Sequence, residues 1–191
     1  MKIIEAAPAK EFLRAIKADF HKYKTLGDRT FAQLSDEDFY AYPYPDANTI
    51  AILIQHISGN LISRFSDFLT SDGEKETRDR DAEFIPHNYP KTELLTIWDK
   101  GYAVLFESLE ELTESDLSAI IYIRHEATSV PEALSRSLAH ISYHIGQIIV
   151  LAKSIKQAQW QTLSIEKGKS KAYNAQMQTE NEEKEEEDST L

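Results

Sequence analysis

The sequence predicts an all-α fold, a four-helix bundle with one short β-prone segment before its last helix. Four long segments repeat apolar residues at the 3.6-residue period of a helix, and no long segment alternates as a strand does. Clusters of proline, glycine and polar residues separate these segments. With 191 residues, of which 41% are hydrophobic, the chain is long enough to bury one core.

The first two helices are expected over residues 9–34 and 49–70, where apolar side chains fall on one face. The link FYAYPYPDAN separates them. Pro43 and Pro45 disfavour helix in this link, and Asn48 is a suitable N-cap for the second helix. That helix carries a long apolar stripe and is expected to end at a Ser-Asp-Gly sequence.

The third helix is expected over residues 91–112, and the fourth ends near residue 155. Between them lies AIIYIRHEATSV, which alternates weakly and is too short to found a sheet, so we expect a small hairpin or an extended strap. Ser129 and Glu132 form a predicted capping pair at the start of the fourth helix.

The C-terminal segment differs sharply in composition from the rest. Residues 171–191 carry seven acidic side chains and two lysines, and they contribute −5 of the net charge of −11. Such a segment has little to bury and repels itself. We therefore expect residues 1–171 to form the bundle domain and residues 172–191 to be an acidic, disordered tail.

Charge and composition also limit the partners and the compartment. The body keeps a negative charge and lacks the clustered lysine and arginine of nucleic-acid-binding proteins. No stretch reaches the length of a membrane span, and MKIIEAAPAKEFL lacks the apolar core of a signal peptide. The absence of cysteine excludes disulfides and cysteine nucleophiles. We expect a cytoplasmic protein that binds neither nucleic acid nor membrane.

Three histidines form the candidate metal site. His140 and His144 lie four residues apart, one turn apart on the same face of the fourth helix. On a helical wheel, His56 lies on the matching flank of the second helix, about 120° from its apolar stripe. Three imidazoles suit Zn, Ni or Fe(II) and leave positions for water or substrate. The alternative is three ordinary packed histidines.

The motifs LIQHISGNL and LAHISYHIGQI resemble those of the DinB/YfiT-like superfamily of bacterial metal-binding four-helix bundles. The following RFSDFLTSDGEK and RDRDAEF are similar to a branch of unknown function, and the resemblance covers about residues 8–156. It implies an up-down-down-up topology, homodimers, and metal ligation by His56, His140 and His144. Members of the superfamily include metal-dependent transferases of bacillithiol and mycothiol, and others are labelled hydrolases.

The resemblance implies an enzyme that transfers a bacillithiol-like thiol to an electrophile, with a small-molecule substrate. Asn60 is a candidate hydrogen-bond donor to water or substrate, and Arg78 and Arg80 are candidate contacts for the carboxylates of the thiol. Their alternatives are an ordinary polar flank and ion pairs within an Arg-Asp run. No catalytic residue beyond the metal ligands is assigned.

Two other functions stay open at this point. A metal-dependent hydrolase needs a general base, for which the loop residues Glu83, His87 and His125 are the candidates. A non-catalytic, dimeric metal-binding bundle needs no base, but structural zinc sites usually have four protein ligands. The sequence distinguishes neither the metal nor the substrate.

Overall fold

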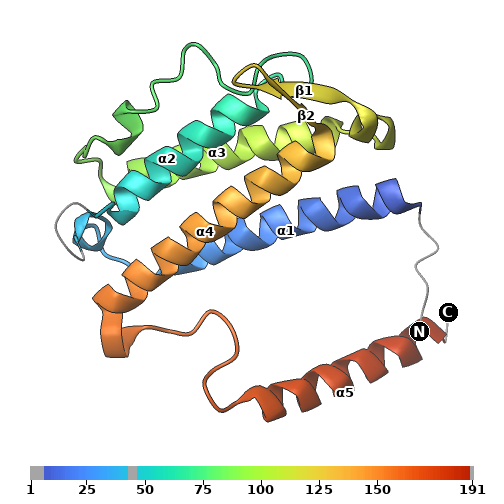
Figure 1. Cartoon of the computed structure of the whole chain (residues 1–191). Coiled ribbons are helices and arrows are strands. Elements are labelled where there is room, and N and C mark those ends of the chain that lie inside the picture. The colour runs from blue at the N-terminus through green and yellow to red at the C-terminus, as the bar shows by residue number, and fades with distance from the viewer. Residues whose placement is uncertain (1–6, 43–46, 190–191) are drawn as a thin grey trace. The chain divides into compact units, whose positions relative to one another are not determined.

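The computed structural model describes residues 7–42 and 47–189, which form five α-helices and one two-stranded antiparallel sheet (Figure 1). This largely helical structure agrees with the expected all-α class. Short 3-10 helices lie in the connections between these elements. The helices are α1 (Pro8–Phe31), α2 (Ile50–Phe65), α3 (Lys91–Glu111), α4 (Val130–Lys156) and α5 (Ser170–Ser189), and the strands are β1 (Ile120–Ile123) and β2 (Glu126–Ser129).

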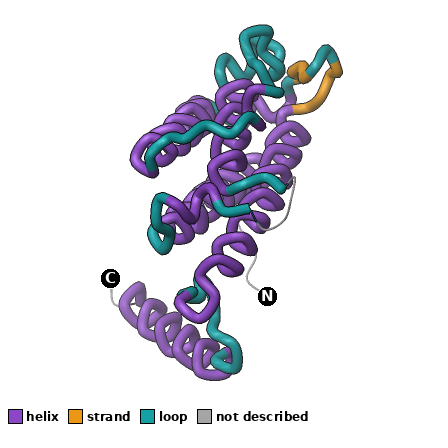
Figure 2. Tube along the Cα trace, turned by 90° about the vertical axis from the view of Figure 1, so that its left-hand side faces the viewer, coloured by secondary structure: helices purple, strands orange, loops and turns teal. Residues whose placement is uncertain are grey.

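Helices α1 to α4 pack on a shared core, with α2 beside α3 and α1 beside α4 (Figure 1). Figure 2 shows from another side that helices make up most of the described chain. Two glycines mark close approaches. A Cβ atom at Gly101 of α3 would lie 2.7 Å from the Cα atom of Ser58 in α2. A Cβ atom at Gly27 of α1 would lie 2.6 Å from the Trp98 ring of α3, whose indole nitrogen donates to Asp28 at 2.8 Å. The core therefore relies on small residues where helices touch.

The ends of the helices agree with the expected capping signals at one helix and differ by one residue at another. Ser129 accepts a hydrogen bond from the backbone N–H of Glu132 at the start of α4, as expected. At α2 the N-cap is Thr49, whose hydroxyl accepts from Ile52, and the expected N-cap Asn48 lies one residue earlier. The proline break expected at residues 43 and 45 lies outside the described residues.

Helix α2 ends at Phe65, five residues before the expected end. Ser66 is extended and Asp67 adopts a left-handed φ of 49°, a conformation that aspartate tolerates better than most residues. The carbonyl of Asp67 then accepts from the N–H groups of Thr70 and Ser71, which makes a turn of its own. The apolar stripe continues through this turn, so periodicity alone extended the helix too far.

The β-prone segment forms the small hairpin β1–β2. Its two turn residues, Arg124 and His125, both have positive φ angles, 56° and 65°, as a tight hairpin turn requires. The carboxylate of Asp72 accepts both of their backbone N–H groups at 2.8 Å. Together with a stronger contribution from the backbone N–H of Glu74, these hydrogen bonds lower the pKa of Asp72 to about 2. The loop after α2 thereby fixes a turn whose own residues are poor turn formers.

The chain divides into two compact units, Met1–Gln159 and Trp160–Leu191. In the second unit, α5 occupies the segment expected to be disordered. Its glutamates, glutamines and lysines are good helix formers, and glutamine–glutamate hydrogen bonds four residues apart support it. The described part of α5 buries none of its side chains. The boundary after residue 171 stays a prediction.

Across the described ranges, no helix combines the length and apolarity needed to cross a bilayer.

Candidate metal centre

Three histidine side chains meet between α2 and α4. One ring nitrogen from each of His56, His140 and His144 lies within 4.8 Å of the other two. His56 comes from the middle of α2, and the other two come from consecutive turns of α4, as their spacing predicts. His56 is 4% exposed and His144 is 6% exposed. The three residues predicted as ligands are thus brought together in a nearly buried position.

The geometry suits a transition metal. The Nε2 atoms of His56 and His140 are 3.1 Å apart. Two nitrogens bound to one tetrahedral zinc at 2.0–2.1 Å would lie about 3.3 Å apart. The Nε2 atom of His144 is buried and has no hydrogen-bond partner among the described residues. A buried nitrogen without a partner is costly, and a bound cation would satisfy it.

Glu83 orients the His56 ring. Its carboxylate lies 2.8 Å from Nδ1 of His56 and accepts the proton there, which leaves Nε2 free to bind a metal. Burial alone would raise the pKa of Glu83, but hydrogen bonds from His56 and Arg78 outweigh it and hold the pKa below its usual value. Gly59 makes room for this carboxylate, because a Cβ atom there would lie 2.3 Å from Oε1 of Glu83.

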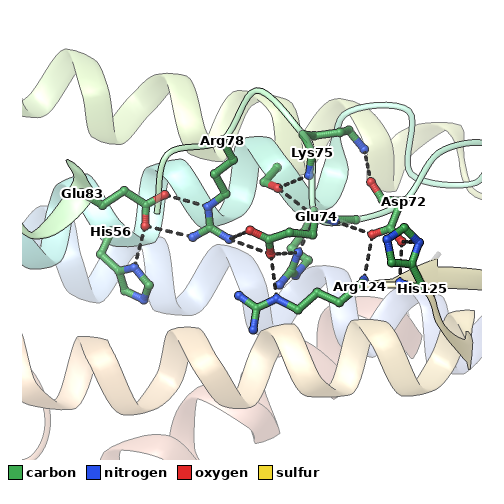
Figure 3. A network of polar contacts seen from close by, with 11 residues as sticks. His56, Asp72, Glu74, Lys75, Arg78, Glu83, Arg124 and His125 are labelled. Carbon is green, nitrogen blue, oxygen red and sulfur yellow. Dashed lines mark hydrogen bonds and ion pairs between the residues drawn. The ribbon is translucent and has the colours of Figure 1, made fainter. Parts of the chain in front are cut away.

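Arg78 holds Glu83 in place with a two-pronged contact (Figure 3). Its Nε and Nη2 atoms donate to the two carboxylate oxygens of Glu83 at 2.7 and 2.9 Å. Its Nη1 atom lies 3.4 Å from Glu74, which also pairs with Arg64 and Arg124. A chain of alternating charges therefore runs from the ring of His56 to the β1–β2 turn.

The two histidines of α4 have different support. Gln147 Oε1 lies 2.8 Å from Nδ1 of His144 and accepts its proton, which leaves Nε2 as the free nitrogen. The Nδ1 atom of His140 is buried, and no described residue forms a hydrogen bond with it. Two of the three rings are therefore held in the tautomer that presents Nε2 to a metal.

Both α4 histidines favour the neutral, metal-binding form. Burial lowers the pKa of His140 to about 3, with further contributions from the neighbouring His144 and His56. Burial also lowers the pKa of His144 to about 4, although its hydrogen bond to Gln147 acts in the opposite direction. Both imidazoles are consequently in the neutral form, with one ring proton, at neutral pH, as metal ligation requires.

A cavity of about 240 Å³ adjoins the histidines and is strongly cationic. His56 and His140 line it together with Asn60, Ser137 and Tyr143. Of the residues that the structure describes, five arginines also line it and no carboxylate does: Arg64, Arg78, Arg80, Arg124 and Arg136. In a chain with a net charge of −11, this concentration of guanidinium groups favours an anionic ligand.

The residues predicted to contact water or substrate lie at the cavity, but not all of them are free to do so. Asn60, Arg78 and Arg80 all line the cavity, but Arg78 directs its guanidinium at Glu83 and Glu74. Arg80 keeps a side chain 48% exposed, with its guanidinium 5.0 Å from the centre of the Phe84 ring. Whether any of them contacts a substrate stays a prediction.

The loop histidines lie apart from the cavity. His125 has a side chain 99% exposed in the hairpin turn, 3.7 Å from Asp72. His87 stacks on Tyr89 with ring centres 5.3 Å apart. Neither is among the residues that line the cavity.

Sequence reasoning missed Gln147 and the roles of Glu83, Arg64, Arg124 and Arg136. The position of Gln147, three residues after His144, was the available signal, because side chains at that spacing meet on a helix. Glu83 was considered only as a general base. Its contact with His56 spans 27 residues through a loop, which no local pattern reveals.

Comparison with known proteins gives a family without an assigned activity. Searches of curated proteins and of solved structures returned no match. A family model described as "Protein of unknown function (DUF1572)" matches residues 7–169, which include the three histidines, Glu83 and Gln147. The chain therefore belongs to the DUF1572 family of proteins of unknown function.

Proposed function

We propose that this protein is a metal-dependent enzyme of the DinB/YfiT-like class, an up-down-down-up four-helix bundle that works as a homodimer. It transfers a low-molecular-weight, bacillithiol-like thiol to an electrophile. One observation carries the metal-dependent part: three nearly convergent imidazoles, two of which are held by Glu83 and Gln147 with Nε2 free. His56, His140 and His144 would hold the ion, which is Zn, Ni or Fe(II).

The chemistry follows from the two parts of the site. A divalent ion held by His56, His140 and His144 would keep its charge and would lower the pKa of a bound thiol, which would then react as a thiolate. The thiolate sulfur forms a bond to the electrophilic carbon, the leaving group departs with its bonding electrons, and the thiol proton passes to solvent. Three of the five arginines that line the cavity pair with Glu74 or Glu83. We therefore expect the other two, Arg80 and Arg136, to hold the carboxylates of the thiol.

The transferase is favoured over a hydrolase by the lack of a general base. Among the described lining residues of the cavity there is no carboxylate. Glu83 uses both oxygens on Arg78 and one on His56, and its pKa is lowered, so it is a poor proton acceptor for water. The loop histidines lie away from the cavity. None of the described residues around the histidines is therefore suited to take a proton from water.

Metal content tests this proposal. Protein purified without tag or chelator should contain about one transition metal per chain by mass spectrometry, and the His56→Ala/His144→Ala variant should contain none. His125→Ala, which changes an exposed histidine, is the matched control and should keep its metal. A wild type that binds no Zn, Ni or Fe(II), or a double variant that keeps its metal, would refute the site.

Activity is tested on the metal-loaded protein. Bacillithiol and a fluorogenic haloalkyl electrophile should be consumed together, and Arg80→Gln/Arg136→Gln should raise KM for the thiol more than it lowers kcat. A protein that holds one metal per chain with no exchangeable water and no turnover would instead be a non-catalytic metal-binding bundle.

A further inference from the structure

A second cavity shares Tyr143 with the arginine-lined cavity. It measures about 600 Å³ and is bordered by Ala47, Asn48 and Leu53 and by the C-terminal half of α4. Every described residue that lines it is uncharged, and Leu53, Val150 and Leu151 supply apolar walls. The cavity beside the arginines has the opposite character. The seam between α2 and α4 thus has one cationic and one apolar compartment.

The two compartments share one wall residue, which stacks beside the candidate metal centre. Tyr143 lines both of them. Its ring centre lies 4.1 Å from that of His144 and 5.2 Å from that of His140. Gln147, which accepts the Nδ1 proton of His144, lines the apolar cavity as well. A molecule in this cavity would therefore lie against the residues that support the ligands.

Gly146 forms part of the floor of the apolar cavity, in the interior of the 27-residue helix α4. Glycine there costs about 1 kcal/mol relative to alanine. Helix packing does not explain this cost, because a Cβ atom at Gly146 would meet nothing within 4 Å. By contrast, Cβ atoms at Gly27 and Gly101 would collide with neighbouring helices. A side chain at Gly146 would instead project into the open space of the cavity.

The apolar walls are left open to water. Val150 is 67% exposed and Tyr143 is 53% exposed, although each borders a concave surface. Concave, mostly apolar cavities with a few polar groups are the usual binding sites of small molecules, and burying apolar surface is their main driving force. None of the described lining residues could form an ion pair with a ligand, which favours an uncharged one here.

We propose that the cavity over Gly146 binds the uncharged, apolar part of the electrophilic substrate. This inference rests on the proposed transferase function, in which the arginine-lined cavity takes the anionic thiol. The electrophile approaches from the Gly146 side, and the two substrates meet at the histidines. The substrate class is therefore an electrophile with an apolar aliphatic or aromatic body.

The test uses a neutral aromatic probe, 1-naphthalenemethanol, titrated into the full-length protein by calorimetry. Metal-free, chelator-treated protein should bind it saturably at one site. Gly146→Leu should raise Kd at least tenfold by filling the cavity, and Gly146→Ala should raise it less. Both variants should stay folded, because both residues favour helix more than glycine does. Ser135→Leu adds the same side chain to an exposed position of α4 that borders neither cavity, and its Kd should be unchanged.

Failure of this inference is distinguishable from failure of the proposed function. No saturable binding by the wild type, or an unchanged Kd in Gly146→Leu, would overturn the inference even if the metal is present. Sedimentation tests whether a second copy of the chain fills the cavity instead. In that case the wild type would be a dimer that binds no probe, and Gly146→Leu would dissociate it. Probe binding with the expected pattern in a protein that never holds metal would leave the cavity assigned and refute the metal site.

Discussion

The two helices that supply the histidines support their rings in different ways. On α2, the Nδ1 proton of His56 goes to Glu83, a residue 27 positions along the chain in a loop of its own. On α4, the Nδ1 proton of His144 goes to Gln147 of the same helix, and His140 has no such partner among the described residues. The first ligand depends on tertiary structure, and the second is held by the helix itself.

The difference also sets the strength of the ligands. An imidazole whose Nδ1 proton is bound by a carboxylate donates its Nε2 electron pair to a metal more strongly than one bound by a neutral amide. The carboxylate stabilises positive charge on the ring. Glu83 is itself fixed by Arg78, whose side chain is only 5% exposed. His56 is therefore the best-prepared ligand of the three, and it is also the one most vulnerable to changes outside its own helix.

The largest effect is expected from Glu83→Gln. This change removes the carboxylate partner of His56 and leaves the buried Arg78 with Glu74 as its only carboxylate partner among the described residues. Loss of such a supporting residue typically lowers metal affinity about 10- to 100-fold. Removing one member of a buried ion pair also destabilises the fold, so Tm should fall. Metal competition with a chromogenic chelator and a thermal melt measure the two effects.

Two further variants sharpen this result. Glu76→Gln makes the same charge change at an exposed position of the same loop and should alter neither quantity. Gly59→Ala keeps every charge but places a Cβ atom where Glu83 now lies, so it should weaken metal binding while α2 stays helical. If Glu83→Gln binds metal as tightly as the wild type, His56 does not need the Glu83 carboxylate in order to bind a metal.

A smaller effect is expected on α4 from Gln147→Ala. The His144 ring loses its acceptor, and metal affinity should fall about tenfold, the low end of the range for such partners. The side chain is exposed, so Tm should hardly change. Gln147→Glu should raise affinity above that of the wild type, because it gives His144 a carboxylate like that of His56. Gln55→Ala, next to His56 but bonded to the Ala51 carbonyl, is the control.

The parts of the site that depend on a single helix could be predicted from the sequence. The positions of His140 and His144 follow from helical spacing, and His56 from the helical wheel. Gln147 lies within the same local pattern and could have been found. Glu83 and Arg78 were named as a candidate base and a candidate substrate contact. Their support of His56 could not be found, because the loop that carries them has no period. Its path depends on contacts such as the one between Gly59 and Glu83.

The fold shows the same division between local and tertiary information. Four helices were expected from periodicity, and their starts agree with the structure to within one residue. The end of α2 was wrong because the apolar stripe runs on through the turn at Asp67. The hairpin turn at Arg124 and His125 has no turn-forming residues of its own and depends on Asp72, 52 residues away from Arg124. The hairpin turn thus resembles the support of His56 by Glu83, since each is held by a side chain far away in the sequence.

The smallest predicted effect concerns pH and the ring without a partner. The pKa of His140 is about 3 in the fold, against about 6.5 for an unperturbed histidine. Between these pH values His140 is protonated in the unfolded chain but neutral in the folded chain. The free energy of unfolding therefore falls as pH decreases from about 6.5. His140→Gln should make this decline shallower, and the exposed control His125→Gln should not. Urea unfolding of chelator-treated protein at pH 7, 6 and 5 measures the slope. Equal slopes in all three proteins would show that the fold does not disfavour protonation of His140.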